Sequence, residues 1–421
     1  MTGTKEWIYQ TNIYEVNLRQ YTKEGSFKAF AHHLPRLKEM GVEVLWFMPI
    51  TAISQKEMKG SMGSYYACSD YKSVNPEFGT LQEFKNLVDH CHKMELKVII
   101  DWVANHTGWD HIWTKEHPEW YKKDWRGEFK RAAGMDDIIE LDYSNTEMRK
   151  AMTEAMKFWV RKCGIDGFRC DLAAWVEVDF WLGAIAEVNE LKPLFWLAEA
   201  DPMQYPDYMQ IFDAAYTWTW MHKTEDWYKE KLPLKDLVKV LDNYENVPGI
   251  KAWFTSNHDE NTWNGTEFEK YGDAAKALAV HSCTWPGIPL VYSGQELPNR
   301  KRLKFFDKDV IQWKKSCELH DFYGTLLHLR RSNPSLNANA DFFQLHTNCD
   351  ANVLAYLRKK DLHEVIVLLN LSDHAVRFQV LDNWIKGKFR EAFRHHEHDF
   401  SVNRSFQMDA WNWLVFVKSF D

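Results

Sequence analysis

The segment GIDGFRCDLAAW, residues 164–175, decides the fold. Its core from Gly167 to Leu172 has the apolar character of a buried strand, yet it carries Arg169 and Asp171 two residues apart. Because successive side chains of a β-strand point to opposite faces, this spacing puts the arginine and the aspartate on the same face. A buried strand that presents a cation and an anion together indicates a polar site at the end of that strand.

Short apolar runs of the same kind recur along the first two thirds of the chain. Several are nearly continuous in apolar residues, as parallel strands buried on both faces are. Amphipathic helical patterns lie between them; one opens with the capping box Thr80-x-x-Glu83, and another is stopped by Gly164. Eight strands that alternate with helices predict a (β/α)8 TIM barrel. The predicted strands are Ile13–Leu18, Val44–Ile50, Val98–Val103, Gly167–Ala173, Leu194–Ala198, Ile211–Tyr216, Trp253–Thr255 and Ile288–Tyr292.

Two segments depart from the barrel pattern. Residues 107–143 follow the third strand, are rich in Trp, Lys and Asp, and predict a small inserted domain. From residue 336 onward, VLAYLRK, EVIVLLNLS, AVRFQV and NWLVFVK read as strands without helices between them, which predicts a C-terminal antiparallel β-sandwich domain. We therefore expect a barrel of residues 1–106 and 144–335, an inserted domain at 107–143 and a β-domain at 336–421.

The composition excludes several classes of partner. A net charge of −8 argues against nucleic acid and anionic membranes, which bind concentrated Lys and Arg. No stretch reaches the roughly 18 apolar residues of a membrane span. The seven cysteines are scattered without C-x-x-C spacing, which argues against a disulfide framework or a zinc ribbon. Buried thiols fit a reducing compartment, so we expect a cytoplasmic protein, although a secreted or periplasmic chain without its leader would look the same.

Aromatic residues make up 15% of the chain, including 21 tryptophans. Many of these rings must belong to the core. The excess also suits a protein that binds carbohydrate, because sugar rings stack their flat C–H faces on aromatic side chains.

Polar residues gather at the predicted C-terminal ends of the strands, where a barrel of this kind keeps its chemistry. Taken singly, each has a structural explanation such as an ion pair, a helix cap or a turn. Burying all of them for structure alone would cost desolvation repeatedly without a gain, so their joint occurrence indicates a functional site. The residues are Tyr66 after the second strand, Asp101, Asn105 and His106 after the third, Arg169 and Asp171 at the fourth, Glu199 after the fifth, and His258 and Asp259 after the seventh.

Four of these segments, DWVANH, GFRCDL, FWLAEA and FTSNHDEN, resemble in order the four signature segments of the α-amylase family of glycoside hydrolases. GVEVLWFMPI, SDYKSVNPEFGT and GIPLVYSGQE are similar to accessory segments of that family. The resemblance covers nearly the whole chain. It implies a retaining hydrolase that cleaves α-1,4-glucosidic bonds in starch-type α-glucans or maltooligosaccharides through a covalent glycosyl-enzyme intermediate.

The resemblance also implies residue roles. Asp171 matches the nucleophile, Glu199 the general acid/base and Asp259 the carboxylate that fixes sugar hydroxyls. The substrate-binding candidates are Tyr66, His106, Arg169, His258, Asp101 and Trp175; Asp101, on a buried strand, is also well explained as a structural residue.

The chemistry of glycosidic bond cleavage independently requires a pair of carboxyl groups. An acid must protonate the leaving oxygen and a second group must meet the oxocarbenium ion, with the two carboxyls roughly 5 Å apart for retention. Their pKa values must be pushed apart. We expect Arg169 to hold Asp171 ionised, and apolar neighbours such as Trp196, together with the other acids, to keep Glu199 protonated.

The chain departs from the family three and four residues after the nucleophile. Many α-amylases carry Lys-His there, whereas this chain has Ala174 and Trp175, and DLAAWVEVDFW is closer to cyclomaltodextrinases and neopullulanases. Short or cyclic α-glucans are therefore plausible substrates, with Trp175 either a stacking platform or packed on the inserted domain. An α-glucosidase, cyclomaltodextrinase or glucanotransferase would use the same catalytic residues, and loops such as QELPNRKRLKFF would decide between them. A non-catalytic carbohydrate-binding protein is the remaining alternative.

A structural calcium ion is common in the family between the barrel and the inserted domain. Asn105 stands at one ligand position, and Glu140 stands where an aspartate ligand is more usual. Oxygen ligands suit Ca²⁺, so these two residues are the metal-ligand candidates, while the chemistry itself requires no cofactor. The expected partner is an α-glucan or maltooligosaccharide; the oligomeric state is left open.

Overall fold

Eight parallel strands close into a barrel in the computed structural model, which describes residues 5–418. The predicted TIM barrel is confirmed, and every predicted run contains or overlaps one barrel strand. The seventh strand begins earlier than expected because its first half includes Lys251, which interrupts the apolar run. The barrel strands are β1 (Ile13–Val16), β2 (Val44–Phe47), β5 (Lys97–Trp102), β8 (Gly167–Cys170), β9 (Phe195–Ala198), β10 (Ala214–Tyr216), β11 (Ile250–Trp253) and β12 (Ile288–Tyr292).

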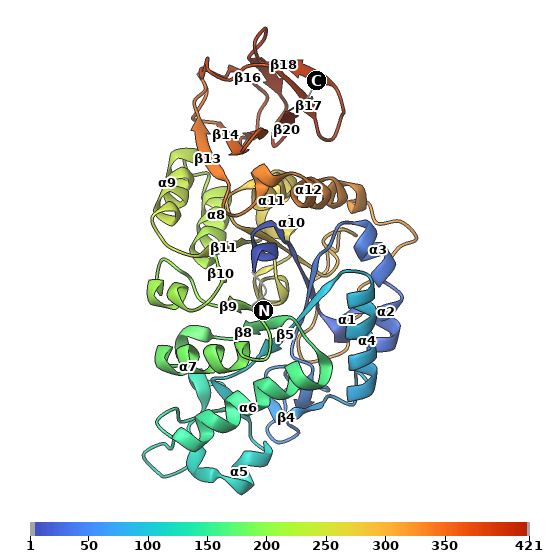
Figure 1. The fold of residues 1–421 in the computed structure, drawn as a ribbon, viewed down its shortest axis with the longest axis vertical. Coiled ribbons are helices and arrows are strands. Elements are labelled where there is room, and N and C mark those ends of the chain that lie inside the picture. Colours follow the sequence, from blue (N-terminus) through green and yellow to red (C-terminus); the bar gives the residue numbers. More distant parts are fainter. Residues whose placement is uncertain (1–4, 419–421) are drawn as a thin grey trace.

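Helices surround the barrel (Figure 1). The predicted capping box is present, since the Thr80 hydroxyl accepts from the Glu83 N–H and the Glu83 carboxylate accepts from the Thr80 N–H. Gly164 ends α6 in a left-handed conformation, as expected. The helices are α1 (Leu18–Tyr21), α2 (Phe27–Ala31), α3 (Leu34–Glu39), α4 (Leu81–Lys93), α6 (Thr146–Cys163), α7 (Val178–Asn189), α8 (Trp218–Glu230), α9 (Leu234–Glu245), α10 (Glu267–Tyr271), α11 (Ala275–Thr284) and α12 (His320–Ser332).

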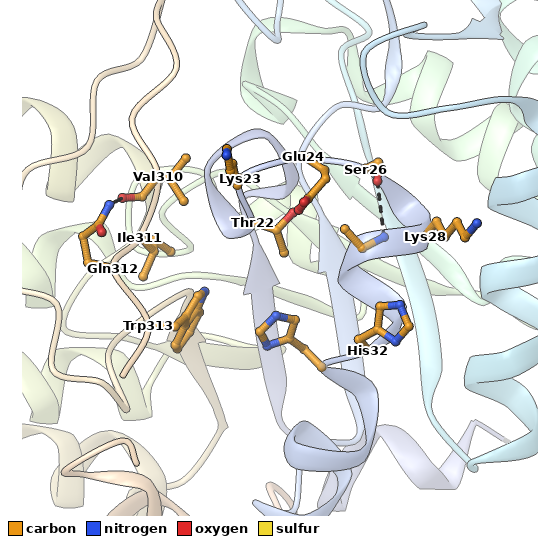
Figure 2. A pocket seen from close by; sticks show the side chains of 12 residues that line it. Thr22, Lys23, Glu24, Ser26, Lys28, His32, Val310, Ile311, Gln312 and Trp313 are labelled. Atoms are coloured by element: carbon orange, nitrogen blue, oxygen red, sulfur yellow. Dashed lines mark hydrogen bonds between the residues drawn. The ribbon is translucent and has the colours of Figure 1, made fainter. Parts of the chain in front are cut away.

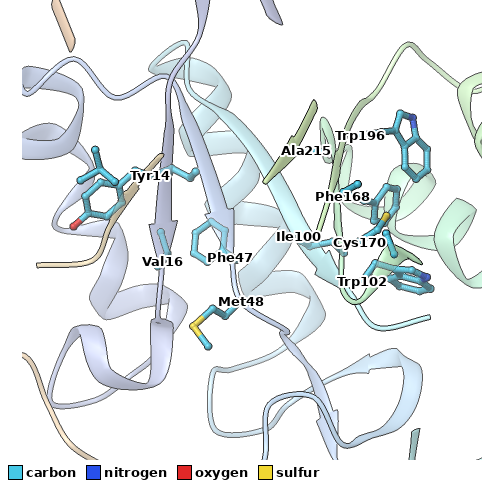
Figure 3. Packing of buried hydrophobic residues seen from close by; sticks show 14 of the residues in the cluster. Tyr14, Val16, Phe47, Met48, Ile100, Trp102, Phe168, Cys170, Trp196 and Ala215 are labelled. Atoms are coloured by element: carbon cyan, nitrogen blue, oxygen red, sulfur yellow. The ribbon is translucent and has the colours of Figure 1, made fainter. Parts of the chain in front are cut away.

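Side chains of the barrel strands alternate between two cores, as the two-residue period of a strand requires. One set packs outside the barrel with helix residues; Figure 3 shows its members Phe168, Cys170 and Trp196 together. The alternate positions, among them Trp46 and Leu197, fill the barrel interior. This alternation turns the polar residue at the end of each strand inward as well.

Gly167 allows two strands to approach inside the barrel. A Cβ at this position would lie 2.0 Å from the carbonyl oxygen of Phe195 on β9, which no real side chain can tolerate. The glycine therefore lets β8 pair closely with β9 and brings Arg169 level with Leu197.

The segment predicted as an inserted domain contains a small antiparallel sheet. Strand β6 (His106–Gly108) pairs with β7 (Ile138–Glu140), and the helix α5 (Ile112–Glu116) follows β6. A further hairpin, β3 (Thr51–Ile53) with β4 (Cys68–Val74), follows β2 and was not predicted. Figure 1 places α5 at the bottom, at the opposite end of the molecule from the C-terminal strands.

Antiparallel strands form the C-terminal domain, as predicted. Four of these strands match the predicted segments, and the four others are short or alternate with exposed polar side chains, so they carry little apolar signal. A six-stranded sheet has the order β13-β14-β15-β20-β17-β18, and β16 pairs with β19. The strands are β13 (Asp341–Leu345), β14 (Val353–Lys360), β15 (His363–Asn370), β16 (Val376–Gln379), β17 (Lys388–Glu391), β18 (Glu397–Asp399), β19 (Ser405–Met408) and β20 (Trp413–Lys418).

The C-terminal domain packs directly on the barrel helices. Trp285, at the end of α11, meets the ring of Tyr356 edge-on with centroids 4.9 Å apart, and the Tyr356 hydroxyl lies 2.6 Å from that of Thr284. Arg358 is buried and donates to the carbonyls of Thr284 and Asn337. One continuous apolar core thus extends from the barrel helices into β14, β15 and β20.

All seven cysteines are free thiols, and five of them are buried. No helix between residues 5 and 418 combines the length and the apolar character needed to cross a membrane.

Candidate active site

One guanidinium holds three carboxyl groups at the C-terminal end of the barrel. The Nη1 atom of Arg169 lies 2.9 Å from Asp101 Oδ1 and 2.9 Å from Asp171 Oδ1. Its Nη2 atom lies 3.0 Å from Glu199 Oε2. The residues predicted as nucleophile and general acid/base therefore contact the same cation, although they come from different strands.

The backbone after Asp171 adds a second link to Glu199. Leu172 has φ 42° and ψ 44°, a left-handed conformation that is strained for a residue with a side chain. In this conformation its N–H donates to Glu199 Oε2 over 2.8 Å. The turn that follows Asp171 thus holds the Glu199 carboxyl in place.

The third predicted carboxylate, Asp259, belongs to a second group of interacting side chains. His258 Nε2 is 3.3 Å from Asp259 Oδ2 and 2.7 Å from the Tyr66 hydroxyl. The Tyr66 hydroxyl donates to Asp101 Oδ2 over 3.1 Å, which joins this group to Arg169. The Asp259 side chain is 37% exposed, whereas those of Asp171 and Glu199 are 8% and 9% exposed.

Burial governs the ionisation of the two central carboxyls. Burial raises the pKa of Asp171 to about 6, although the positive charge of Arg169 acts in the opposite direction. It raises the pKa of Glu199 to about 7, with Arg169 lowering it and the charges of Asp171 and Asp259 raising it further. Arg169 therefore favours the ionised form of Asp171 against the effect of burial, while burial and the neighbouring carboxylates favour the protonated form of Glu199.

Trp196 does not contribute to this difference, so that expectation was wrong. Trp196 and Glu199 are three residues apart, which places them on opposite faces of the strand. The Trp196 ring packs outside the barrel against Phe168, and its Nε1 donates to Asn189. Glu199 is kept protonated by its own burial and by neighbouring carboxylates.

Asp101 and Arg169 are positioning residues and do not line the substrate cleft. Both side chains have 0% exposure. Asp101 accepts from Trp46 Nε1, from Tyr66 and from Arg169, so its oxygens are taken by protein donors. The expectation that these two residues bind substrate is corrected accordingly.

His106 lies in β6, apart from the carboxylates. It is buried, its Nδ1 is 3.2 Å from the Asn105 amide nitrogen, and its Nε2 has no hydrogen-bond partner within residues 5–418. Burial lowers its pKa to about 4, so the ring is neutral at pH 7. Within residues 5–418 His106 forms no hydrogen bond or ion pair with Arg169 or Asp171, although its ring interacts with the backbone of Tyr66.

The residues at the expected calcium position do not fit a calcium ion. Glu140 Oε1 lies 2.6 Å from Lys122 Nζ, and Oε2 lies 2.8 Å from Lys130 Nζ. Both oxygens are thus paired with ammonium groups, whose charge repels a cation. Within residues 5–418 no cluster of three or more His, Cys, Asp or Glu side chains is arranged to hold a metal. The assignment of Asn105 and Glu140 as metal ligands is therefore not supported by their surroundings.

A cleft of about 340 Å³ opens beside Glu199. Trp175 is 47% exposed and lines this cleft, so it is not packed away on the inserted segment. Tyr205, Trp218 and His222 line it as well, with the Trp218 and His222 rings stacked at 5.6 Å. Aromatic faces thus surround the approach to the acid.

A larger cavity of about 640 Å³ lies elsewhere, between the segment after β1 and the loop after β12. Figure 2 shows Trp313 and His32 among the residues around it. None of the predicted site residues lines this cavity, so its size does not make it the active site.

Several residues of the site were not predicted from the sequence. Glu15, on the inner face of β1, lies 2.6 Å from His258 Nδ1, and Tyr216 on β10 accepts from Arg169 Nε over 3.3 Å. The Phe305 ring stacks on Tyr66 with centroids 6.1 Å apart. The two-residue alternation that pointed to Arg169 and Asp171 also marks Glu15, since Ile13 two residues earlier is an interior position.

Known proteins resemble this chain over most of its length. Residues 8–136 and 116–187 match the family profile described as "Alpha amylase, catalytic domain". Alpha-amylase 2 of Dictyoglomus thermophilum is 23% identical over 92% of this chain and 73% of its own length. The maltogenic alpha-amylase of Bacillus acidopullulyticus is 25% identical over 84% of this chain and 64% of its own length. The chain thus spans roughly two thirds to three quarters of these curated relatives.

A solved structure matches the whole fold. The maltogenic alpha-amylase AmyB of Thermotoga neapolitana superposes with a TM-score of 0.89 at 26% identity, covering 98% of this chain and all of that one. The superposition covers both the barrel and the C-terminal β-domain, the family profile matches the first part of the barrel, and the chain belongs to the α-amylase family of glycoside hydrolases.

Proposed function

We propose that this protein is a retaining hydrolase of α-1,4-glucosidic bonds in starch-type α-glucans or maltooligosaccharides, with Asp171 as nucleophile and Glu199 as general acid/base. The observation that carries the proposal is the shared guanidinium of Arg169. Asp171 and Glu199 contact the same guanidinium at 2.9 Å and 3.0 Å, so the two carboxyl groups meet at one point of the barrel rim, which supports the double displacement of a retaining enzyme.

The first step breaks the glycosidic bond. Arg169 holds Oδ1 of Asp171, which leaves Oδ2 to attack the anomeric carbon. Oε2 of Glu199 accepts from the Leu172 N–H, so the carboxyl proton sits on Oε1 and passes to the leaving oxygen. The C–O bond of the leaving sugar breaks as the bond to Asp171 forms.

The second step restores the enzyme. Glu199, now ionised, takes a proton from water, and the water oxygen attacks the same carbon. The bond to Asp171 breaks and its carboxylate is released. Two inversions at one carbon give a product with the configuration of the substrate.

The open side of the site supports a sugar ligand. Asp259 is partly exposed and can accept from hydroxyl groups, and the Tyr66 ring lies next to it through His258. The relatives named above are called alpha-amylases or maltogenic alpha-amylases, which supports an α-glucan as substrate.

Product analysis tests the proposal. Purified protein is incubated with soluble starch, maltotriose and cyclodextrin, reducing ends are measured, and the anomer formed first is identified by NMR. We expect new reducing ends of α configuration, and losses of about 10³-fold or more in Asp171→Asn and Glu199→Gln. Full activity in either variant, or a β product, would contradict it.

A second candidate activity is transfer of the glycosyl group to an acceptor sugar, which the aromatic lining of the cleft favours. Trp175, Tyr205 and Trp218 line the cleft beside the acid, where an acceptor sugar would compete with water for the glycosyl-enzyme. This cleft favours short oligosaccharides over long starch. Transferase activity predicts longer oligosaccharides from maltotriose at high concentration, and fewer of them in Trp175→Ala. A protein that binds these sugars without forming any product would be a carbohydrate-binding relative.

A further inference from the structure

Glu15 is a carboxylate buried inside the barrel that the proposed mechanism does not use. It lies on the inner face of β1 with no exposed surface. Its Oε1 lies 2.6 Å from His258 Nδ1 and 3.3 Å from the His258 backbone nitrogen. Its Oε2 is buried without a hydrogen-bond partner in the described chain. A carboxylate kept in such a place at a cost in stability indicates that its charge is needed.

The hydrogen bonds around His258 define how its ring is protonated. The Tyr66 hydroxyl has one proton and donates it to Asp101, so its oxygen must accept from His258 Nε2–H. On the other side, the Nδ1 atom lies 2.6 Å from Glu15 Oε1; burial raises the pKa of Glu15 and the charge of His258 lowers it, and an ionised Glu15 can only accept, so Nδ1 donates to it. Both ring nitrogens therefore carry a proton, and the imidazole is a cation held in one orientation.

The surroundings of the ring are consistent with this charge. Burial opposes it, but the carboxylates of Asp259 and Glu15 outweigh burial and raise the pKa of His258 to about 9. The titratable and charged groups that face the ring are Glu15 from β1, Tyr66 from the segment before β4, Asp101 from β5, Arg169 from β8 and the adjacent Asp259. Of these, Glu15 contacts Nδ1, whereas Tyr66 and Asp259 lie near the other ring nitrogen, Nε2.

We propose that Glu15 is a positioning residue: it keeps His258 charged and oriented, so that Nε2–H holds the Tyr66 hydroxyl in place and its positive charge stays next to Asp259, where the sugar binds. This rests on the proposed function only in naming the sugar as the group that is bound beside Asp259 and Tyr66. Loss of the Glu15 charge would let Nε2 lose its proton and become an acceptor. The Tyr66 hydroxyl would then turn from Asp101 to His258, and the hydrogen-bond chain to Arg169 would break.

The first experiment needs no sugar. Histidine labelled with ¹⁵N reports whether both ring nitrogens are protonated, and the His258 signal is assigned by its absence in His258→Asn. We expect an imidazolium signal at pH 8 in the wild-type protein, and a neutral ring at that pH in Glu15→Gln. A neutral His258 in the wild-type protein at pH 8 would overturn the proposal whether or not the protein hydrolyses glucans.

The second experiment measures sugar binding without turnover. Maltotriose affinity is measured calorimetrically for Glu199→Gln and for the double variant with Glu15→Gln, from pH 5 to pH 8. We expect the second change to weaken binding about 10- to 100-fold at pH 8. The loss should shrink toward pH 5, where His258 regains its proton. A loss that does not vary with pH, or no loss at all, contradicts the assignment.

Glu296 supplies the matched control. It is also fully buried, and it has one oxygen held by the Tyr14 hydroxyl at 2.7 Å and by Arg36 at 2.8 Å and one without a hydrogen-bond partner in the described chain; it forms no hydrogen bond or ion pair with His258. Glu296→Gln should reduce stability yet leave the pH dependence of maltotriose binding unchanged. Glu15→Asp, which keeps the charge on a shorter side chain, should restore part of the binding; if it binds no better than Glu15→Gln, the charge is not what matters. If Glu199→Gln binds no maltotriose, the proposed function fails, and the NMR result alone decides on Glu15.

Discussion

At the scale of single residues, Asp171 and Glu199 share a cation but differ in how readily each loses its proton. Burial raises both pKa values, to about 6 for Asp171 and about 7 for Glu199. Their order is the one that a nucleophile and an acid require.

Activity should therefore depend on pH as a narrow bell. Asp171 must be ionised, so the rate should fall as pH drops below about 6, and Glu199 must be protonated, so it should fall as pH rises above about 7. The measurement is kcat/KM on maltotriose from pH 4 to pH 9. A plateau that extends to pH 9 would show that Glu199 is not the acid.

Glu199 should also lower the stability of the folded protein at neutral pH. Its folded pKa is about 7, above the ordinary value of 4.5, so its charged form is disfavoured by folding. Its contribution to stability is complete below pH 4.5 and is lost as pH rises to about 7. Glu199→Gln carries no charge and should unfold about 1–3 °C higher than wild type at pH 8 but at the same temperature near pH 4.5. An equal difference at both pH values would argue against this linkage.

At the scale of elements, the close pairing of β8 and β9 depends on Gly167. Gly167→Ala puts a Cβ 2.0 Å from the Phe195 carbonyl oxygen, so the strands must separate. We expect a loss of about 3 kcal/mol in the free energy of unfolding, or a chain that does not fold. The control is Gly183→Ala in α7, where a Cβ meets nothing within 4 Å; this change should stabilise by up to about 1 kcal/mol. Denaturant unfolding of both variants compares them, and equal stabilities would contradict the close-approach argument.

The barrel strands could be predicted because parallel strands buried on both faces read as apolar runs. The hairpin β3–β4 could not, since polar and partly exposed residues such as Asp70 and Lys72 interrupt it. Strand β18, with the sequence EHD, has no apolar residue at all and is defined only by its pairing with β17. Such strands depend on tertiary contacts that the local sequence does not contain.

The site could be predicted as a set of strand ends but not as a set of contacts. The alternation of strand residues placed Arg169 and Asp171 on one face, and the same rule excludes Trp196 from the neighbourhood of Glu199. Whether Glu140 meets a metal or two lysines depends on Lys122 and Lys130, which lie 18 and 10 residues away along the chain, and spacing alone does not place them.

At the scale of the whole molecule, the C-terminal domain and the barrel should unfold together. Trp285 and Tyr356 pack across the boundary, and the same apolar core includes residues of both parts. Differential scanning calorimetry should show a single transition, and Tyr356→Ala should move all of it to lower temperature. Two separate transitions, with the variant affecting one alone, would show that the domains are independent.

Chelation should leave the protein intact. The ion pairs with Lys122 and Lys130 leave neither oxygen of Glu140 for a metal. Loss of a structural ion present at a hundred times its Kd would cost about 2.7 kcal/mol. We expect the same unfolding temperature in EDTA as in calcium. A fall of several degrees in EDTA that calcium reverses would show that the ion displaces the lysines.

In the proposed mechanism, the guanidinium of Arg169 lies between the nucleophile Asp171 and the acid Glu199, and its effect on Glu199 would change during the reaction. Once Asp171 had become an ester, its negative charge would be gone, and with it the repulsion that raises the pKa of Glu199. Arg169 then has one anion fewer to neutralise, so its full field falls on Glu199, whose proton has just been given away. The ionised form of Glu199, which is disfavoured at the start of the cycle, is therefore stabilised for as long as the sugar stays attached to Asp171. It is disfavoured again once water has released Asp171. Arg169 would thus stabilise the negative charge of Asp171 in one step and that of Glu199 in the next, without moving.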